Sequence, residues 1–221
     1  MGKNADRIIA SAADIWSGYY THPFVTGIAD GSLDRDKFKF YMIQDYLYLF
    51  DYARVFALGT VKTMDPGTMR ICADYVDRIL HEEMEIHKGY MKRLGISPEE
   101  AETAVISLDN LSYTSYMLRI AYDGGIAEIL AAILSCAVSY EYIGRHIVQN
   151  HPGSTGHEFY GEWIGSYSSE GYAEANRALE DLVDKHTAGY SEEQLKNLEQ
   201  VFINCSRYEA LFWDMSWERR L

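Results

Sequence analysis

The sequence predicts an all-α fold, and three observations favour this class. Apolar residues recur at helical spacing along the 221 residues, whereas the apolar and polar alternation of β-strands does not recur. Serines and glycines stand at spacings typical of helix ends. Prolines fall only where a helix would begin or a loop would run; they are Pro23, Pro66, Pro98 and Pro152. The pattern therefore predicts long helices joined by short loops.

Eight helices and one short turn follow from these signals. In chain order the helices cover residues 4–18, 34–63, 66–93, 110–123, 126–149, 156–167, 169–187 and 191–219, with the turn near 98–104. Pro66 begins the third helix, Pro98 begins the short turn, and the loop around Pro152 ends the fifth helix. The boundaries carry an error of a few residues.

Capping signals support several of these ends. Two pairs have the spacing of a capping box: Ser97 with Glu100, and Ser191 with Gln194. Three glycines stand where left-handed C-terminal caps belong: Gly95, Gly124 and Gly189. With no repeat, linker or low-complexity tract, residues 1–221 are expected to form a single helical domain, an antiparallel bundle with its site in the core.

Charge and composition exclude several classes of partner. The chain has 33 acidic and 20 basic residues, a net charge of -13, and no dense basic run, so nucleic acid is not expected as a partner. The N-terminus has no signal-peptide core, and Asp6 stands where a myristoylation pattern needs Ser or Thr. No apolar run approaches about 18 residues, so no membrane span is expected. We therefore expect a soluble, cytoplasmic protein whose cysteines are free thiols.

Asp45 is the first candidate for a functional site. It lies in a strongly apolar helical segment, residues 38–56, and shares its stripe only with aromatic and apolar residues: Phe38, Tyr41, Met42, Tyr48, Leu49 and Tyr52. A carboxylate there loses hydration, which favours its protonated form unless a donor or cation holds the charge. A buried structural acid and a ligand-binding acid both fit this pattern.

Two other stripes carry candidate chemistry. Cys136 lies on an apolar helical face with Tyr140 one turn later, and Glu209 is a second lone carboxylate among aromatic residues, one turn after Cys205. An inert core explains either stripe by itself, but two buried acids and a thiol in one bundle also suit a general acid and a ring-binding group. The carboxylate near Cys205 would raise the pKa of that thiol, which favours Cys136 as nucleophile.

Tyrosines supply a further signal, because the chain has 18 of them and several fall at interior positions such as Tyr113 and Tyr167. They fit an ordinary core with satisfied hydroxyls. They equally fit a cavity whose walls stack a flat ligand and whose hydroxyls fix its polar edge.

Metal, haem and serine-hydrolase sites fit less well. Glu83 and His87 are one turn apart, but a di-iron site needs a Glu-x-x-His pair on each of two helices, and no second pair exists. His22 could ligate haem, yet the acidic aromatic core offers no partner for its propionates. The chain has no G-x-S-x-G elbow in a strand context. We expect neither a metal nor a cofactor.

Taken together, the motifs resemble the TenA family, the thiaminase II or aminopyrimidine aminohydrolase group of the haem-oxygenase-like superfamily. The matching pieces, spread over nearly the whole chain, are Trp16 with His22, Pro23 and Phe24; Gly31 to Leu33; F-x-x-Y-x-x-Q-D-x-x-Y from Phe38; Glu83 with His87; Y-T-S-Y from Tyr113; C-x-x-x-Y-E from Cys136; W-I-x-x-Y-x-S from Trp163; and Y-E-x-x-F-W-D-M from Tyr208. Ser135 departs from the pattern, because many members have proline before the cysteine.

The resemblance implies a haem-oxygenase-like multi-helix bundle, a homotetramer, and hydrolysis of the substituent on the 5-methylene of 4-amino-2-methylpyrimidines in thiamine salvage. The products would be hydroxymethylpyrimidine and either ammonia, from the aminomethyl compound, or a thiazole, from thiamine. It matches Cys136 to the nucleophile, Asp45 to the acid at the ring nitrogen and amino edge, and Glu209 to the acid that protonates the leaving amine and then serves water addition.

The same resemblance implies which residues line the pocket. Four tyrosines match family residues that orient the ring or the thiol: Tyr48, Tyr113, Tyr140 and Tyr167. His87 is kept only as a supporting group. The alternative function is a non-catalytic pyrimidine-binding, haem-binding or regulatory protein on the same fold, although the negative charge argues against direct contact with DNA.

Overall fold

The structure is a computed structural model that describes residues 3–221. Its helices are α1 (Asn4–Ala10), α2 (Ala13–Thr21), α3 (Pro23–Asp30), α4 (Arg35–Lys62), α5 (Pro66–Arg78), the π-helix η1 (Ile79–Glu83), α6 (Met84–Arg93), α7 (Pro98–Glu102), α8 (Leu108–Asp123), α9 (Ile126–Asn150), the 3₁₀ turn η2 (Ser154–Gly156), α10 (Gly161–Tyr167), α11 (Glu170–His186) and α12 (Glu192–Glu218). Residues 3–221 include no strand, and the predicted all-α class is confirmed.

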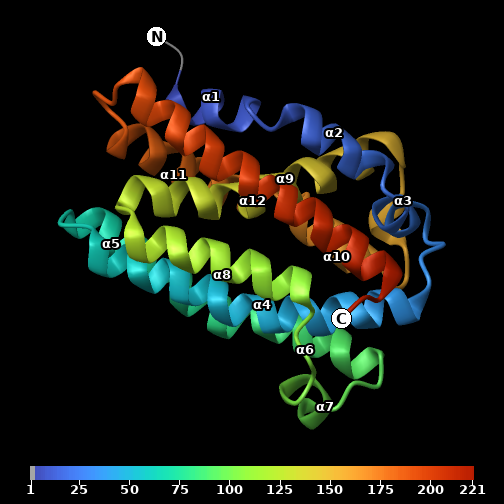
Figure 1. Cartoon of the computed structure of the whole chain (residues 1–221). Coiled ribbons are helices and arrows are strands. Elements are labelled where there is room, and N and C mark those ends of the chain that lie inside the picture. The colour runs from blue at the N-terminus through green and yellow to red at the C-terminus, as the bar shows by residue number, and fades with distance from the viewer. Residues whose placement is uncertain (1–2) are drawn as a thin grey trace.

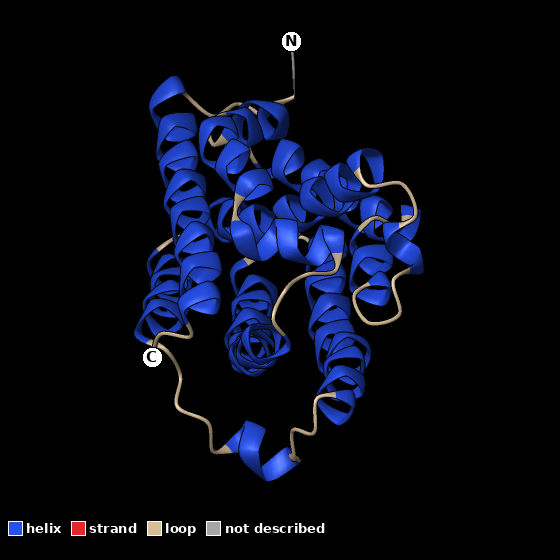
Figure 2. Cartoon of the chain, turned by 90° about the vertical axis from the view of Figure 1, so that its right-hand side faces the viewer, coloured by secondary structure: helices blue, strands red, loops and turns tan. Residues whose placement is uncertain are grey.

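Four long helices form the centre of the molecule (Figure 1): α4, α8, α9 and α12. Helix α9 contacts each of the other three and also α10 and α11, so it lies in the middle of the core. Helices α5 and α6 pack against α4, whereas α1 and α2 pack against α12. The short α7 projects from the body of the bundle in both views (Figures 1 and 2).

The apolar character of α9 follows from its central position. By length and composition this helix could cross a membrane, which the sequence analysis had not anticipated, but 72% of its most apolar window is buried in the bundle. Contact with six other α-helices, α2 among them, leaves it few positions that face water, and apolar residues are favoured at buried positions.

The N-terminal region differs from the prediction. The single helix expected at 4–18 is two helices, because the backbone of Ala12 leaves the helical region (φ -108°, ψ 9°) and the hydroxyl of Ser11 donates a hydrogen bond of 2.6 Å to the carbonyl of Ile8. Helix α3 was not predicted. Pro23 occupies its first turn, and it ends at Gly31, whose φ of 80° is in the left-handed region.

The predicted helix 66–93 is continuous but contains one turn of π-helix, η1. In an α-helix a step of four residues overshoots one turn by roughly 40°, so side chains spaced four apart drift off a common face. The wider turn of η1 compensates for this drift. As a result Tyr75, Ile79, Glu83 and His87, each four residues apart, all line the same cavity.

Of the five predicted capping signals, three are confirmed, one is half formed and one is wrong. Ser97 accepts a hydrogen bond from the amide of Glu100, but the return bond of a capping box is not made. Ser191 and Gln194 form the expected capping box, and both Gly95 and Gly189 have positive φ. Gly124, however, is extended (φ -91°, ψ -172°), because α9 begins two residues later.

The helix predicted at 156–167 begins only at Gly161. His157 precedes it, and Nδ1 of His157 accepts hydrogen bonds from the amides of Phe159 and Tyr160, which holds this segment in a turn.

Gly144 brings α10 against α9. A Cβ atom at this position would lie 2.7 Å from the carbonyl carbon of Tyr167 and 2.8 Å from the amide nitrogen of Ser168. Only glycine permits this approach, which sets Tyr167 at the wall of the cavity.

Candidate active site

A cavity of about 180 Å³ lies between α4, the α5–α6 segment, α9, α10 and α11. Six of the residues predicted for the site line it: Asp45, Tyr48, His87, Cys136, Tyr140 and Tyr167. They come from four helices that are far apart in the sequence. Aromatic walls with a few polar groups are typical of a site for a small, flat molecule.

Asp45 and His87 form a buried pair in the wall of the cavity. Nε2 of His87 lies 2.6 Å from Oδ2 of Asp45, and Nδ1 lies 2.9 Å from the carbonyl oxygen of Glu83. A carbonyl can only accept, so Nδ1 carries a proton. The Nε2–Oδ2 contact then holds one further proton, placed either on the imidazole or on the carboxyl.

The pKa of His87 shows how this proton is held. Burial lowers the pKa, but the hydrogen bond to Asp45 and the charges of Asp45 and Glu83 outweigh burial, and the pKa is raised. His87, expected only as a supporting group, therefore contacts the central acid directly.

Cys136 is the only one of the three cysteines that lines the cavity, whereas Cys72 and Cys205 are fully buried elsewhere. Burial raises the pKa of the Cys136 thiol well above its usual value, the charge of Glu209 raises it further, and the Tyr48 hydroxyl opposes the shift. The thiol is therefore protonated in the free protein and needs a proton acceptor before it can act as a nucleophile.

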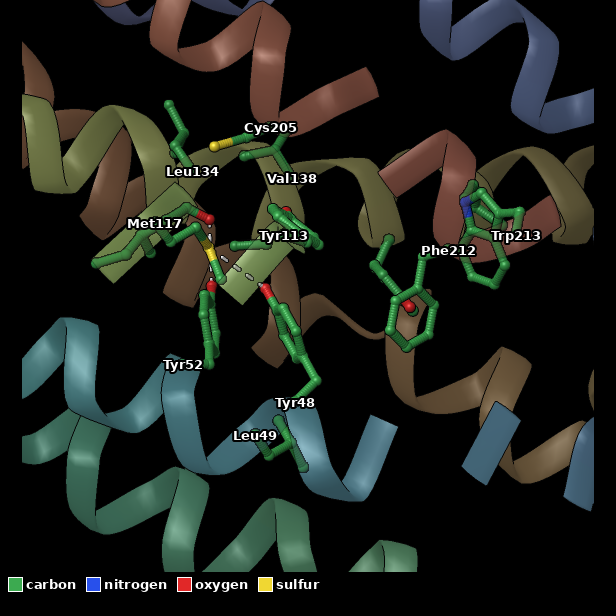
Figure 3. Packing of buried hydrophobic residues seen from close by; sticks show 14 of the residues in the cluster. Tyr48, Leu49, Tyr52, Tyr113, Met117, Leu134, Val138, Cys205, Phe212 and Trp213 are labelled. Carbon is green, nitrogen blue, oxygen red and sulfur yellow. Dashed lines mark hydrogen bonds between the residues drawn. The ribbon is translucent and has the colours of Figure 1, made fainter. Parts of the chain in front are cut away.

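Tyr48 also packs against the next layer of the core. Figure 3 shows its hydroxyl pointing from α4 toward the sulfur of Met117 on α8, at 3.8 Å. Its ring lies 5.4 Å from the ring of Tyr113, which is fully buried and does not line the cavity. Tyr113 was expected in the pocket; the structure places it one aromatic layer deeper, because Tyr48 separates it from the ligand space.

Glu209 likewise does not line the cavity, contrary to the expected convergence of three groups on one space. Its side chain is 2% exposed, and its charge raises the pKa of both Cys136 and Tyr140, so it lies just beyond the wall that these two residues form. Burial raises the pKa of Glu209 to about 8, the charge of Asp45 adds to the shift, and the hydroxyls of Tyr113 and Tyr140 oppose it.

Two buried polar atoms at Glu209 and Tyr113 make no hydrogen bond within residues 3–221. They are Oε2 of Glu209 and the hydroxyl oxygen of Tyr113. Unsatisfied buried polar atoms are costly, and a group with such atoms beside a cavity is able to exchange a proton.

A wall of three aromatic residues closes one side of the cavity. The ring of Tyr167 lies 4.7 Å from that of Tyr140 and 4.8 Å from that of Trp163. The hydroxyl of Tyr41 lies 3.3 Å from both the Tyr140 hydroxyl and Nε1 of Trp163, which fixes the two rings. Trp163 had been noted only as part of a motif, because nothing in its own helix identifies the face toward the cavity.

Glu83 is the second cavity residue that the sequence analysis did not assign to the site. Burial raises its pKa to about 7; the charge of His87 opposes the shift and that of Asp45 adds to it. Its carboxyl has no hydrogen bond or ion pair with any of residues 3–221. The four-residue spacing to His87 had suggested only a metal site, and the part of the chain that the structure describes contains no group of three candidate metal ligands.

Ser135 anchors the helix directly before Cys136. Its hydroxyl lies 2.9 Å from that of Ser206 on α12, and Ser206 Oγ also accepts a hydrogen bond of 3.1 Å from Nε1 of Trp16. Helix α9 runs through this position without interruption. The serine thus ties the cysteine-bearing helix to α12 and α2.

Comparison with known proteins identifies the family. Residues 9–219 match the model of the TENA/THI-4/PQQC family. The chain is 44% identical to an aminopyrimidine aminohydrolase of Halalkalibacterium halodurans over 98% of its own length and 96% of that protein. The structure of a TenA homologue from P. horikoshii superposes with a TM-score of 0.89 at 30% identity, covering 98% of this chain and 99% of that one.

A domain from Shewanella denitrificans described as having a heme oxygenase-like fold gives a TM-score of 0.78 at 16% identity, over 97% of this chain and 92% of that one. This likeness confirms the haem-oxygenase-like fold expected from the motifs. From the match over almost its full length and the high identity to a curated relative, the chain belongs to the TENA/THI-4/PQQC family.

Proposed function

We propose that this protein is an aminopyrimidine aminohydrolase of thiamine salvage that converts 4-amino-5-aminomethyl-2-methylpyrimidine and water into the hydroxymethyl compound and ammonia. The observation that carries the proposal is the cavity itself, in which one thiol and the Asp45–His87 pair, with a proton held between them, face aromatic walls that suit a flat ring. The activity of the relative at 44% identity supports the same substrate class.

Binding of the ring follows from the walls and the pair. Tyr140, Trp163 and Tyr167 offer aromatic faces on which a pyrimidine packs. Asp45 would meet a ring nitrogen and the amino edge, where an acid and an acceptor are both useful. Because His87 holds the proton of the pair close to Oδ2, that proton can be shared with the ring, which makes the ring carbons more electrophilic.

Cys136 would then form a covalent intermediate. Its sulfur adds to the ring carbon beside the one that bears the methylene group, while the thiol proton passes to the ring-nitrogen edge at Asp45. The ring electrons break the exocyclic C–N bond, water adds to the methylene carbon, and the C–S bond breaks to return the thiol. One C–N bond is lost and one C–O bond is gained overall.

Glu209 would move the remaining proton. With a pKa of about 8 it is protonated near neutral pH, so it can give a proton to the departing nitrogen and take one from the incoming water. Tyr140 connects Glu209 to the cavity, because it lines the cavity and its hydroxyl acts on the pKa of Glu209. Tyr48 lines the cavity together with the thiol, its hydroxyl opposes the rise in the pKa of the thiol, and it would orient the thiol.

Thiamine carries the same pyrimidine and methylene carbon, with a thiazolium as leaving group, and we include it as a second substrate. The experiment is incubation of the purified protein with each compound, with ammonia or free thiazole as the readout and kcat/KM compared side by side. Release of ammonia from the aminomethyl compound is expected. A folded protein that binds neither compound and releases neither product would overturn the proposal in favour of a different ligand.

A further inference from the structure

Glu83 is a cavity residue to which the reaction described above gives no task. It lies four residues before His87, and both side chains line the cavity. Four residues of α-helix rise about 6 Å, so Glu83 and His87 are separated along their helix by roughly the width of one ring. Because Asp45 and Glu83 line the same cavity, a substituent on a ring held at Asp45 can lie beside Glu83.

The charges around the cavity single out this carboxyl. Asp45 is paired with His87, and Glu82, at the rim, lies 3.3 Å from Nε of Arg78. Glu83, by contrast, is partly buried at the cavity, and its carboxyl makes no hydrogen bond or ion pair with residues 3–221; the charges of His87 and Arg78 act on it without direct contact. An unpaired carboxylate in such a place is stabilised by a cation that the ligand brings.

Aromatic rings surround the same end of the cavity. Tyr75 and Tyr172 both line the cavity together with Glu83. The ring of Tyr75 stacks on Phe56 at 4.7 Å and its hydroxyl donates to the carbonyl of Ala175 at 2.9 Å, so it is held in place. Aromatic faces beside a carboxylate are a setting that favours organic cations.

We propose that Glu83, with Tyr75 and Tyr172, binds the positively charged group on the exocyclic methylene of the substrate and so selects cationic substituents over neutral ones. This inference rests on the proposed function, because it takes the ring to be held at Asp45. Both substituents considered above are cations, one an ammonium and the other a thiazolium. An ammonium departs as neutral ammonia; the ammonia then takes the proton of Glu209, and the Glu209 carboxylate takes one from the incoming water, so the balance of protons is kept.

The test compares one cationic and one neutral ligand with the same ring. KM for the aminomethyl pyrimidine and Ki for the hydroxymethyl product are measured at pH 8 in wild type, Glu83→Gln and Glu82→Gln. Loss of a charge-assisted contact is expected to raise KM by about tenfold or more in Glu83→Gln, with Ki changed by less than about twofold. Glu82 is the matched control: it is the adjacent acid, and its loss should leave both constants within about twofold.

Equal weakening of both ligands by Glu83→Gln would mean that Glu83 only shapes the cavity, and the inference would be wrong. A second measurement does not depend on the reaction: binding of benzylammonium and of benzyl alcohol, which share a ring and differ in charge. A preference of the wild type for benzylammonium that Glu83→Gln removes supports the cation site, even if no pyrimidine is turned over. The absence of that preference in the wild type overturns it, whatever the activity.

Discussion

Nε2 of His87 lies 2.6 Å from Oδ2 of Asp45, and this contact joins α6 to α4 across the wall of the cavity. Because the other ring nitrogen of His87 is committed to the carbonyl of Glu83, the contact stores a single proton at the position where a ring nitrogen would bind. The pair is buried on both sides, so its proton exchanges with a ligand more readily than with bulk water.

Replacing Asp45 by Asn tests the role of this proton. The amide keeps the size of the side chain and can still accept from Nε2 of His87, but it cannot share a proton with the ring. We expect turnover to fall by about 10²-fold or more while the helical circular dichroism is unchanged. Loss of folding together with activity would assign Asp45 a structural role only, and full activity would remove it from the mechanism.

Matched substitutions of Cys136 and Cys205 distinguish which of the two thiols is the nucleophile. Cys136→Ser is expected to lower turnover by about 10²-fold or more, because a hydroxyl stays protonated near neutral pH. Cys205→Ser should leave turnover within about threefold, since this residue is fully buried and does not reach the cavity. Steady-state kinetics on both folded variants decides the assignment, and the reverse ranking would make Cys205 the nucleophile.

Replacing Glu209 by Gln should raise the stability of the protein and lower its activity. The pKa of Glu209 is raised from 4.5 to about 8, so between these values the folded state binds more protons than the unfolded state, and stability falls as pH rises through this window. At pH 7 the cost is on the order of 3 kcal/mol, which Glu209→Gln removes. The variant should melt several degrees higher than wild type at pH 7 but not at pH 4, while turnover falls by about 10²-fold.

Thermal melts at the two pH values and a rate measurement check this prediction. A Glu209→Gln variant that is less stable than wild type at both pH values would show that the carboxyl is satisfied in the folded protein. A wild-type rate that does not decline above about pH 8 would indicate that the protonated form is not required.

Ser135→Ala probes the link between the cysteine-bearing helix and α12. Removing the hydroxyl leaves Ser206 with one hydrogen-bond partner fewer, and we expect a loss of about 1 kcal/mol in the free energy of unfolding. Turnover should stay within about twofold, because Ser135 does not line the cavity. Urea denaturation measures the first quantity; a large loss of turnover would mean that this contact positions Cys136.

Spacing within single helices could predict much of the molecule. The apolar stripes of α4, α9 and α12 follow from a period of 3.6 residues, and they marked Asp45, Cys136 and Glu209 before any geometry was known. The Ser191 capping box is equally local, because both of its hydrogen bonds lie within three residues.

Relations between helices were beyond this kind of prediction. The partner of Asp45 is 42 residues away, and the π-helical turn η1 alters the rotation of the helix just before Glu83. Periodicity also cannot tell a cavity wall from the layer behind it, which is why Glu209 looked equivalent to Asp45. The predicted left-handed cap at Gly124 is wrong for a similar reason. The start of the next helix, rather than the end of the helix before it, sets the backbone conformation of Gly124.

The raised pKa of the Cys136 thiol also bears on how long the protein survives in an oxidising environment. Peroxide attacks thiolates, and a cysteine kept protonated inside a cavity is oxidised slowly to sulfenic acid. The reactive sulfur anion would exist only while a pyrimidine occupies the cavity and shields it. Inactivation by hydrogen peroxide, followed as loss of turnover, should therefore be slow without ligand and no faster with the hydroxymethyl product bound.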